Sequence, residues 1–156
     1  MEGMETNAEI EMYLVVVEEG CEAVVRALDG LDAEAMHWKP AATANSCGAI
    51  AKHSLANAER NVLMTFAGEA YDWRRAEEFL ADDETVESLR RAWASLRTRM
   101  RRSLDAIPES RLSEMLQHPR MGAVSGRAVL LQTTRHVSEH RGEAELTRGL
   151  IEAGRG

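Results

Sequence analysis

The segment from Asp83 to Ile107 carries the most regular hydrophobic pattern of the chain. Its apolar residues alternate by threes and fours, at Val86, Leu89, Trp93, Leu96, Met100, Leu104 and Ile107. That spacing places them on one face of an α-helix with about 3.6 residues per turn. Acidic residues precede the pattern and arginines cluster in its later turns, an order that the helix dipole favours. The segment is therefore predicted to be an amphipathic helix that serves packing rather than chemistry.

Three further segments show helical periodicity, over about residues 6–28, 45–66 and 125–151. Asn45 or Ser46 can cap the second of them, because a short polar side chain accepts a hydrogen bond from a free backbone N–H. Connectors of roughly 15 to 20 residues separate the four predicted helices, and connectors of that length allow crossovers. The expected fold is all-α, a four-helix bundle with long crossover connections. The whole chain, residues 1–156, is expected to form a single domain.

Composition and charge limit the kinds of partner that the protein is expected to bind and the cellular compartment in which it is expected. The net charge of −7 disfavours nucleic acid as the main partner, since phosphate binding relies on a basic surface. No apolar run approaches the roughly 20 residues that span a bilayer, and the acidic N-terminal stretch lacks the features of a signal peptide. We therefore expect a cytoplasmic protein with no membrane partner. The arginines between residues 90 and 102 are interpreted as the solvated faces of one helix.

Five other residues have a structural interpretation, and for three of them, Cys47, His37 and Trp38, a functional one is also open. Cys21 falls on an apolar stripe and reads as a small core residue, whereas Cys47, near a helix start, is either packed or a reactive thiol. His37 and Trp38 form either a packed surface anchor or the mouth of a pocket. His118, followed by Pro119, most simply marks a turn.

His136 and His140 are the strongest candidates for chemistry. They are four residues apart, which on a helix places two side chains on one face, one turn from each other. The apolar or small residues at positions 129, 133, 144 and 151 share this phase, so the two imidazoles are expected to face the core. Buried polar groups without partners cost roughly 2–7 kcal/mol by transfer estimates, and a shared metal ion would satisfy both rings.

His53, on the second predicted helix, is the candidate for a third ligand. Imidazole nitrogens suit zinc, nickel, iron or copper. Three protein ligands with one open position are the arrangement of catalytic zinc, which lowers the pKa of bound water to about 7. The second nitrogen of each ring needs a partner too, for which the candidates are Asn57, Thr133, Glu139 and Glu143. Because the HxxxH spacing lacks the glutamate of HExxH, the zinc-peptidase interpretation does not apply.

Several stretches together resemble the DinB/YfiT-like superfamily of metal-dependent enzymes. They are LDGLDAEAMHWKP before the second predicted helix, AIAKHSLANAE around His53, WRRAEEF before the third helix, and LLQTTRHVSEHRGEAELTRGLI. The resemblance covers nearly the whole chain in the same order, and the connector at residues 113–126 matches least. It implies a four-helix bundle with a long crossover, in which His53, His136 and His140 take the places of the family's metal triad. The implied cofactor is a divalent transition metal, zinc or nickel, with iron as a further option.

The resemblance also implies functions and partners. Characterised members of the superfamily include transferases that use mycothiol or bacillithiol, related isomerases and hydrolases, and damage-inducible proteins; many form homodimers. The first hypothesis is therefore a metal-dependent transferase that joins a small thiol to an electrophile, with arginines such as Arg75 or Arg141 attracting an acidic cosubstrate. A hydrolase using metal-bound water is a near alternative. The other class is a non-catalytic, stress-associated bundle with a structural metal site.

Overall fold

A computed structural model describes residues 7–70 and 83–155, and these are mostly helical. In chain order the elements are α1 (Ala8–Arg26), α2 (Ala33–His37), α3 (Cys47–Ala58), η1 (Glu59–Phe66), α5 (Val86–Leu104), η2 (Glu109–Leu112), β1 (Met115–His118), β2 (Gly122–Ser125) and α6 (Gly126–Arg155). The two strands form one antiparallel hairpin. The predicted all-α class is confirmed, because this hairpin is the only sheet among the described residues.

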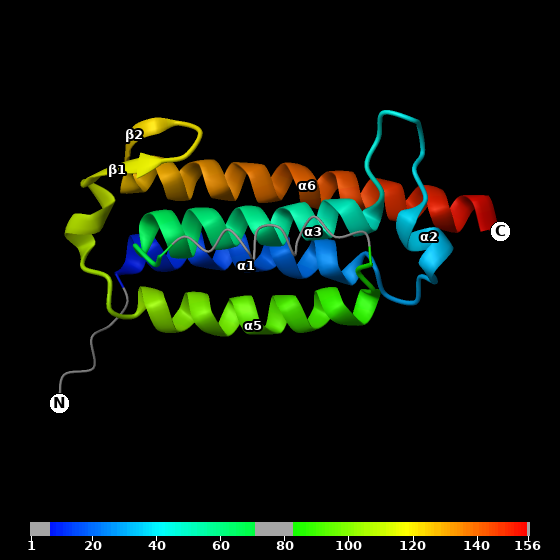
Figure 1. Cartoon of the computed structure of the whole chain (residues 1–156), viewed down its shortest axis with the longest axis horizontal. Coiled ribbons are helices and arrows are strands. Elements are labelled where there is room, and N and C mark those ends of the chain that lie inside the picture. The colour runs from blue at the N-terminus through cyan, green and yellow to red at the C-terminus, as the bar shows by residue number, and fades with distance from the viewer. Residues whose placement is uncertain (1–6, 71–82, 156) are drawn as a thin grey trace.

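Four long helical segments lie side by side: α1, α3 continued by η1, α5 and α6 (Figure 1). Helix α1 contacts α3, α5 and α6, and α3 contacts α5 and α6. The colours in Figure 1 show that α1 and α6 run in one direction, while α3 and α5 run in the other. The connection between α3–η1 and α5, which lies largely outside the described residues, therefore joins opposite ends of the molecule.

Side-chain caps explain where the helices begin. Asn7 Oδ1 accepts from the backbone N–H groups of Glu9 and Ile10 and starts α1. Ser46, one of the two residues expected to cap the second helix, accepts from Ala49 N at 3.2 Å. Thr85 caps α5, so this helix starts a few residues later than the acidic pair suggests. Each predicted helix is present, with ends that differ by a few residues, and the second one changes its winding in its last eight residues.

The apolar stripes predicted from periodicity form the core. In α5 the residues Leu89, Trp93, Leu96, Met100 and Leu104 are all buried. In α6 the phase that contains Val129, Thr133, Ala144 and Ile151 is buried as expected. Helices α1 and α6 approach closely at Gly20, where an added Cβ would lie 2.6 Å from Val137 Cγ2. The absence of a side chain at residue 20 thus allows α6 to pack against α1.

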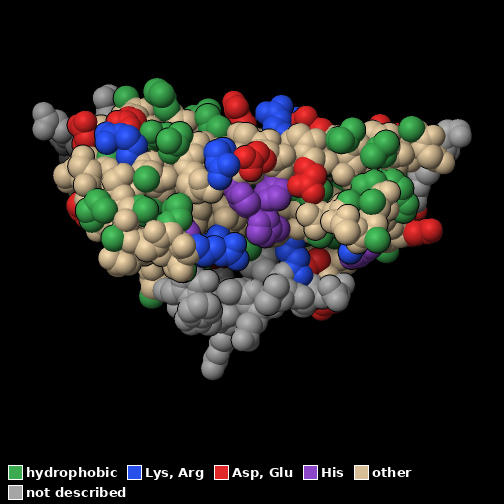
Figure 2. Space-filling view, turned by 90° about the horizontal axis from the view of Figure 1, so that it is seen from above, with side chains coloured by type: hydrophobic (Ala, Val, Ile, Leu, Met, Phe, Trp, Pro, Cys, Tyr) green, Lys and Arg blue, Asp and Glu red, His purple; other side chains and the backbone are tan. Residues whose placement is uncertain are grey.

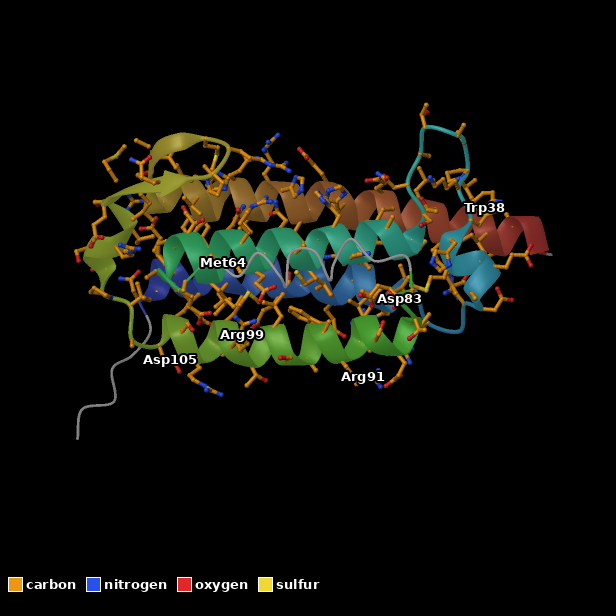
Figure 3. The ribbon with its side chains drawn as sticks, viewed as in Figure 1. Trp38, Met64, Asp83, Arg91, Arg99 and Asp105 are labelled. Atoms are coloured by element: carbon orange, nitrogen blue, oxygen red, sulfur yellow. The ribbon has the colours of Figure 1, made fainter. Side chains whose placement is uncertain are left out.

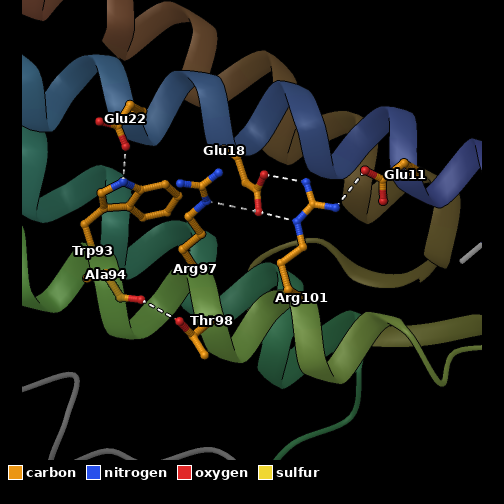
Figure 4. A network of polar contacts seen from close by, with 8 residues as sticks. All are labelled: Glu11, Glu18, Glu22, Trp93, Ala94, Arg97, Thr98 and Arg101. Atoms are coloured by element: carbon orange, nitrogen blue, oxygen red, sulfur yellow. Dashed lines mark hydrogen bonds and ion pairs between the residues drawn. The ribbon is translucent and has the colours of Figure 1, made fainter.

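Two arginines of α5 do more than cover a solvated face, which corrects that interpretation. Arg101 forms bonds of 2.7 and 2.5 Å to both carboxylate oxygens of Glu18 on α1, and a further bond to Glu11 (Figure 4). The Glu18 side chain is only 8% exposed, although it is a charged residue on an amphipathic helix. The hydrogen bonds to Glu18 and then Glu11 raise the pKa of Arg101. Likewise, Arg99 binds Glu59 and Glu69.

The connectors contain structure that the sequence pattern did not reveal. Helix α2 lies in the first connector, and η2 with the β1–β2 hairpin lies in the third. The expected turn after His118 is present, since residues 119–121 join the two strands. The second connector, with Trp73, Arg75 and Phe79, falls outside the described residues. No helix among the described residues is both long and apolar enough to cross a membrane.

Candidate metal centre

The three predicted ligands converge from two antiparallel helices. His53 lies on α3, whereas His136 and His140 lie one turn apart on α6. The Nε2 atom of His136 is 3.0 Å from Nε2 of His53 and 3.1 Å from Nε2 of His140. The rings stand edge to face, with interplanar angles of 67°, 82° and 87°. Three nitrogens of one kind therefore point at a common centre.

Hydrogen bonds between the rings cannot pair all three of these Nε2 atoms. A neutral imidazole has one N–H donor and one nitrogen lone pair. His140 Nδ1 lies 2.9 Å from Glu143 Oε2, and because a carboxylate only accepts, Nδ1 carries the proton and Nε2 the lone pair. Nε2 of His136 faces two other Nε2 atoms, yet it has either one proton or one lone pair. This nitrogen can therefore form a good hydrogen bond in only one of its two contacts. A single cation, by contrast, can accept the lone pairs of all three nitrogens.

The distances also fit an ion. Zinc–nitrogen bonds are about 2.0–2.1 Å long, so two nitrogens on one zinc or similar ion lie about 3–3.4 Å apart. The two observed separations of 3.0 and 3.1 Å fall at this spacing. Such ligands must be unprotonated. Burial, followed by the charges of His140 and His53, lowers the pKa of His136 to about 4, which keeps this ring neutral near pH 7.

One predicted outer partner is in place. Among Asn57, Thr133, Glu139 and Glu143, only Glu143 forms a hydrogen bond to a ring of the triad within the described residues, at 2.9 Å. Its other oxygen accepts from Asn45 Nδ2 at 3.2 Å. Asn45 was a candidate helix cap, but its side chain instead holds the carboxylate that orients His140. Fixing the tautomer of a ligand in this way is a common device of metal sites.

The triad lies at the molecular surface, not in the core, and this corrects the expectation that both histidines of α6 face inward. His53 is exposed, and His136 and His140 are partly buried. A group of histidine side chains is visible on one face of the molecule, bordered by basic and acidic side chains (Figure 2). Their phase on α6 matches the core stripe only approximately, so the rings project along its edge toward α3. Solvent and small molecules can therefore reach the centre directly.

The family model described as mycothiol S-transferase matches residues 14–153. The match includes all three histidines and at least the greater part of every helix. The chain belongs to the mycothiol S-transferase family. This confirms the resemblance to the DinB/YfiT-like superfamily, of which the family is a member. A comparison with curated proteins gave no match.

For this family member the sequence pattern missed a buried polar network beside the triad. Asn61 Nδ2 donates to Asn57 Oδ1 and Thr133 Oγ1, and Asn61 Oδ1 accepts from His118 Nε2 at 2.9 Å. His118 is 6% exposed and Asn61 is 1% exposed. The polar stripe of residues 53, 57 and 61 was a signal for such a network, but nothing local identified His118 as its partner.

The same helix changes its winding next to the site. The eight residues Glu59–Phe66 form a π-helix, so the backbone of Ala67 bonds to Val62 rather than to a residue four positions back. Such wide turns are rare in proteins overall, and those that do occur are frequently found at functional sites. The segment contains neither proline nor glycine, and its periodicity still predicts an ordinary α-helix. Here the local pattern gives the wrong winding.

Other residues with a functional interpretation lie apart from the triad. Cys47 is buried and its thiol donates to Ala144 O at 3.8 Å; burial, opposed by Arg148, raises the pKa of the thiol. Trp38 follows α2 and is 41% exposed (Figure 3). Arg141 pairs with Glu145 on the same helix, and Arg75 lies outside the described residues. The described geometry therefore gives Cys47 a packing role.

Proposed function

We propose that His53, His136 and His140 hold one divalent transition metal ion, zinc or nickel with iron as the further option. The observation that carries this proposal is the convergence of three Nε2 atoms at about the spacing of ligands on one ion. Three histidines leave an open position, as in catalytic rather than structural zinc sites. The exposed His53 places that position within reach of solvent.

We further propose that the protein is a metal-dependent thiol S-transferase, which joins a low-molecular-weight thiol of the mycothiol or bacillithiol type to a small electrophile. Membership of the mycothiol S-transferase family supports this activity. A divalent ion, when bound, supplies a Lewis acid that favours the thiolate form of a coordinated thiol. The chain's own part is to lower the pKa of His53 and His136 by burial, to hold His140 through Glu143 and Asn45, and to leave the site open on one face.

The first test measures metal content in untagged protein. We expect about one equivalent of metal in the wild type, from the single triad, and almost none in a His136→Ala, His140→Ala double variant that keeps its helical circular dichroism. His37→Ala is the matched control, because His37 is an exposed histidine on α2. Wild-type protein that stays without metal after reloading with zinc, nickel and iron would contradict the metal site.

The second test measures chemistry with the loaded protein. Mycothiol and bacillithiol are each offered with 1-chloro-2,4-dinitrobenzene and monobromobimane, and conjugation is followed by absorbance and fluorescence. We expect thiol-dependent conjugation that the double variant lacks. Thiol-independent hydrolysis of ester substrates would instead indicate the hydrolase. Metal binding without thiol binding or turnover would indicate a structural metal in a non-catalytic protein. Formation of a homodimer remains a prediction, which sedimentation would test.

A further inference from the structure

The hydrogen bonds that join the hairpin to η1 have one defined direction. The backbone N–H groups of Arg120 and Met121 donate to His118 Nδ1, both at 3.1 Å, so the proton of this ring lies on Nε2. Nε2 then donates to Asn61 Oδ1 at 2.9 Å. The positions of oxygen and nitrogen in the Asn61 amide are thereby fixed, and its two N–H groups face away from the hairpin.

This direction also fixes the amide of Asn57. The N–H groups of Asn61 donate to Asn57 Oδ1 at 3.3 Å and to Thr133 Oγ1 at 3.1 Å. The Thr133 hydroxyl in turn donates to the carbonyl of Val129 at 2.7 Å. Because Asn57 accepts through its oxygen, its Nδ2 offers two N–H donors to some other group.

These two donors are not used by the protein itself. Nδ2 of Asn57 has no acceptor within the part of the chain that the structure describes, although the residue is only 8% exposed. Fully buried side-chain nitrogens without a partner do not occur among the described residues, so Nδ2 keeps contact with solvent. Buried polar groups are normally paired, and each exception calls for an explanation. Asn57 thus holds free donors at an opening of the surface.

The opening lies beside the histidine triad. Asn57 follows His53 by four residues on α3, which places it one turn away on the same face, after a rise of about 6 Å. Side chains of a helix tilt toward its N-terminus, so Asn57 leans toward His53. On α6, Thr133 precedes His136 by three residues. The free donors therefore border the triad, whose histidines are visible at the surface in Figure 2.

We propose that Asn57 is a substrate-binding residue, whose Nδ2 donates a hydrogen bond to an oxygen of a small molecule bound at the histidine triad. A carbonyl or hydroxyl oxygen fits this donor, because a side-chain amide is uncharged. The substrate class is then a thiol that carries such an oxygen a few bonds from its sulfur. This assignment of the substrate rests on the proposed function, whereas the presence of free donors does not.

The first experiment tests the free donors in metal-free protein. Exchange of the side-chain NH₂ groups with water is measured by ¹H–¹⁵N NMR. Asn61 is the reference, because both of its N–H groups donate inside the protein. We expect the NH₂ of Asn57 to exchange faster by on the order of tenfold or more, since protected groups exchange only when their hydrogen bonds open. Equal protection of the two amides would overturn the proposal whatever the metal content.

The second experiment tests the substrate class. Cobalt(II)-loaded protein is titrated with ω-mercaptoalkanamides and with alkanethiols of equal chain length, and binding is read from the sulfur-to-cobalt absorption. The ratio of the two affinities is compared between proteins. At the best chain length we expect Asn57→Leu to lower the preference for the amide by about two- to tenfold, the contribution of one neutral hydrogen bond.

Thr133→Val is the matched control. Each of the two substitutions removes one acceptor of Asn61, so both disturb the polar network, but only the first removes the donors of Asn57. Thr133→Val should therefore keep the preference of the wild type. If Asn57→Leu does not fold, Asn57→Asp takes its place, since a carboxylate still accepts from Asn61 and offers no donor.

Two outcomes would contradict the substrate class: the same preference in wild type and Asn57 variant at every chain length, or an equal loss in Thr133→Val. If no thiol produces the absorption band, the proposed thiol chemistry fails. The exchange measurement then decides by itself whether Asn57 offers free donors at the site.

Discussion

Two polar clusters of the molecule, Glu18 with Arg101 between α1 and α5, and the histidine triad between α3 and α6, are organised in opposite ways. In the first, a carboxylate and a guanidinium meet in a fork of two bonds, and opposite charges neutralise each other. In the second, three nitrogens of the same kind face one another, and their lone pairs cannot all be paired by protons. One cluster is complete within the chain, whereas the other needs something from outside it.

The comparison separates polar residues that hold the fold from polar residues that await a ligand. Glu18 is buried, and its partner reaches it along the side of α5. The triad is partly exposed, and its carboxylate Glu143 orients a ring instead of neutralising a cationic side chain. Removal of residues from the first cluster should therefore change stability, and removal from the second should change ligand binding.

The largest effect on stability is expected for Glu18→Ala. The substitution leaves Arg101 without its main partner in a partly buried position, which should cost about 2–3 kcal/mol of unfolding free energy. Urea denaturation measures this cost, and metal content should stay the same. Glu19→Ala changes an exposed neighbour on the same helix and should stay within about 0.5 kcal/mol. An equal, small effect of both variants would show that the first cluster does not hold the fold.

For Glu143→Ala we expect the reverse pattern, an effect on metal binding rather than on stability. Loss of the partner of His140 Nδ1 should weaken metal affinity by about 10–100-fold, as is typical when an outer partner of a ligand is removed. Competition with a chromogenic chelator measures this affinity. Glu139→Ala is the control, since Glu139 lies on the same helix but pairs with Arg135. If both variants bind metal equally, Glu143 does not orient the ligand.

In metal-free protein, lowering the pH should reduce the free energy of unfolding through His136 of the triad. The pKa of His136 is about 4 in the folded state against 6.5 as the unperturbed value, chiefly because of burial. The unfolded chain therefore binds more protons between these values, and stability that is fully present above pH 6.5 falls as the pH drops toward 4. Denaturation at a series of pH values should show a shallower fall for His136→Gln than for the wild type. Parallel curves would contradict this contribution.

The smallest effect is expected for Arg135→Gln. Arg135 pairs with Glu139 one turn away, and their side chains are 61% and 57% exposed. Exposed pairs of this kind contribute about 0–0.5 kcal/mol, so neither the urea midpoint nor metal affinity should change measurably. A clear loss of metal would mean that the charged surface around the triad takes part in binding.

Much of the helical framework was predictable, because apolar periodicity is a local property. The stripes of α1, α5 and α6 each follow from the spacing of side chains along one helix. The pairing of His136 with His140 follows in the same way, since four residues on one helix fix their separation. His53 was a weaker inference, because its partner lies 83 residues away in the sequence.

The failures have a common physical origin. Glu18 reads as a surface residue until Arg101 covers it from another helix. His118 reads as a turn residue until the hairpin folds over Asn61. The π-helix of η1 has no local signal in a segment free of proline and glycine. For Glu18 and His118 the missing information is the placement of one element against another.

The sequence by itself determined the helices, their buried faces and the identity of three candidate ligands, because these depend on spacing within short segments. Only the tertiary structure decided that the three rings meet at the surface, that Glu143 and Asn45 orient one of them, and that His118 of the hairpin binds Asn61 of η1. Those relations join residues of antiparallel helices and a hairpin. They depend on the packing of α3 against α6 and of the hairpin against η1 and α6, which no single segment encodes.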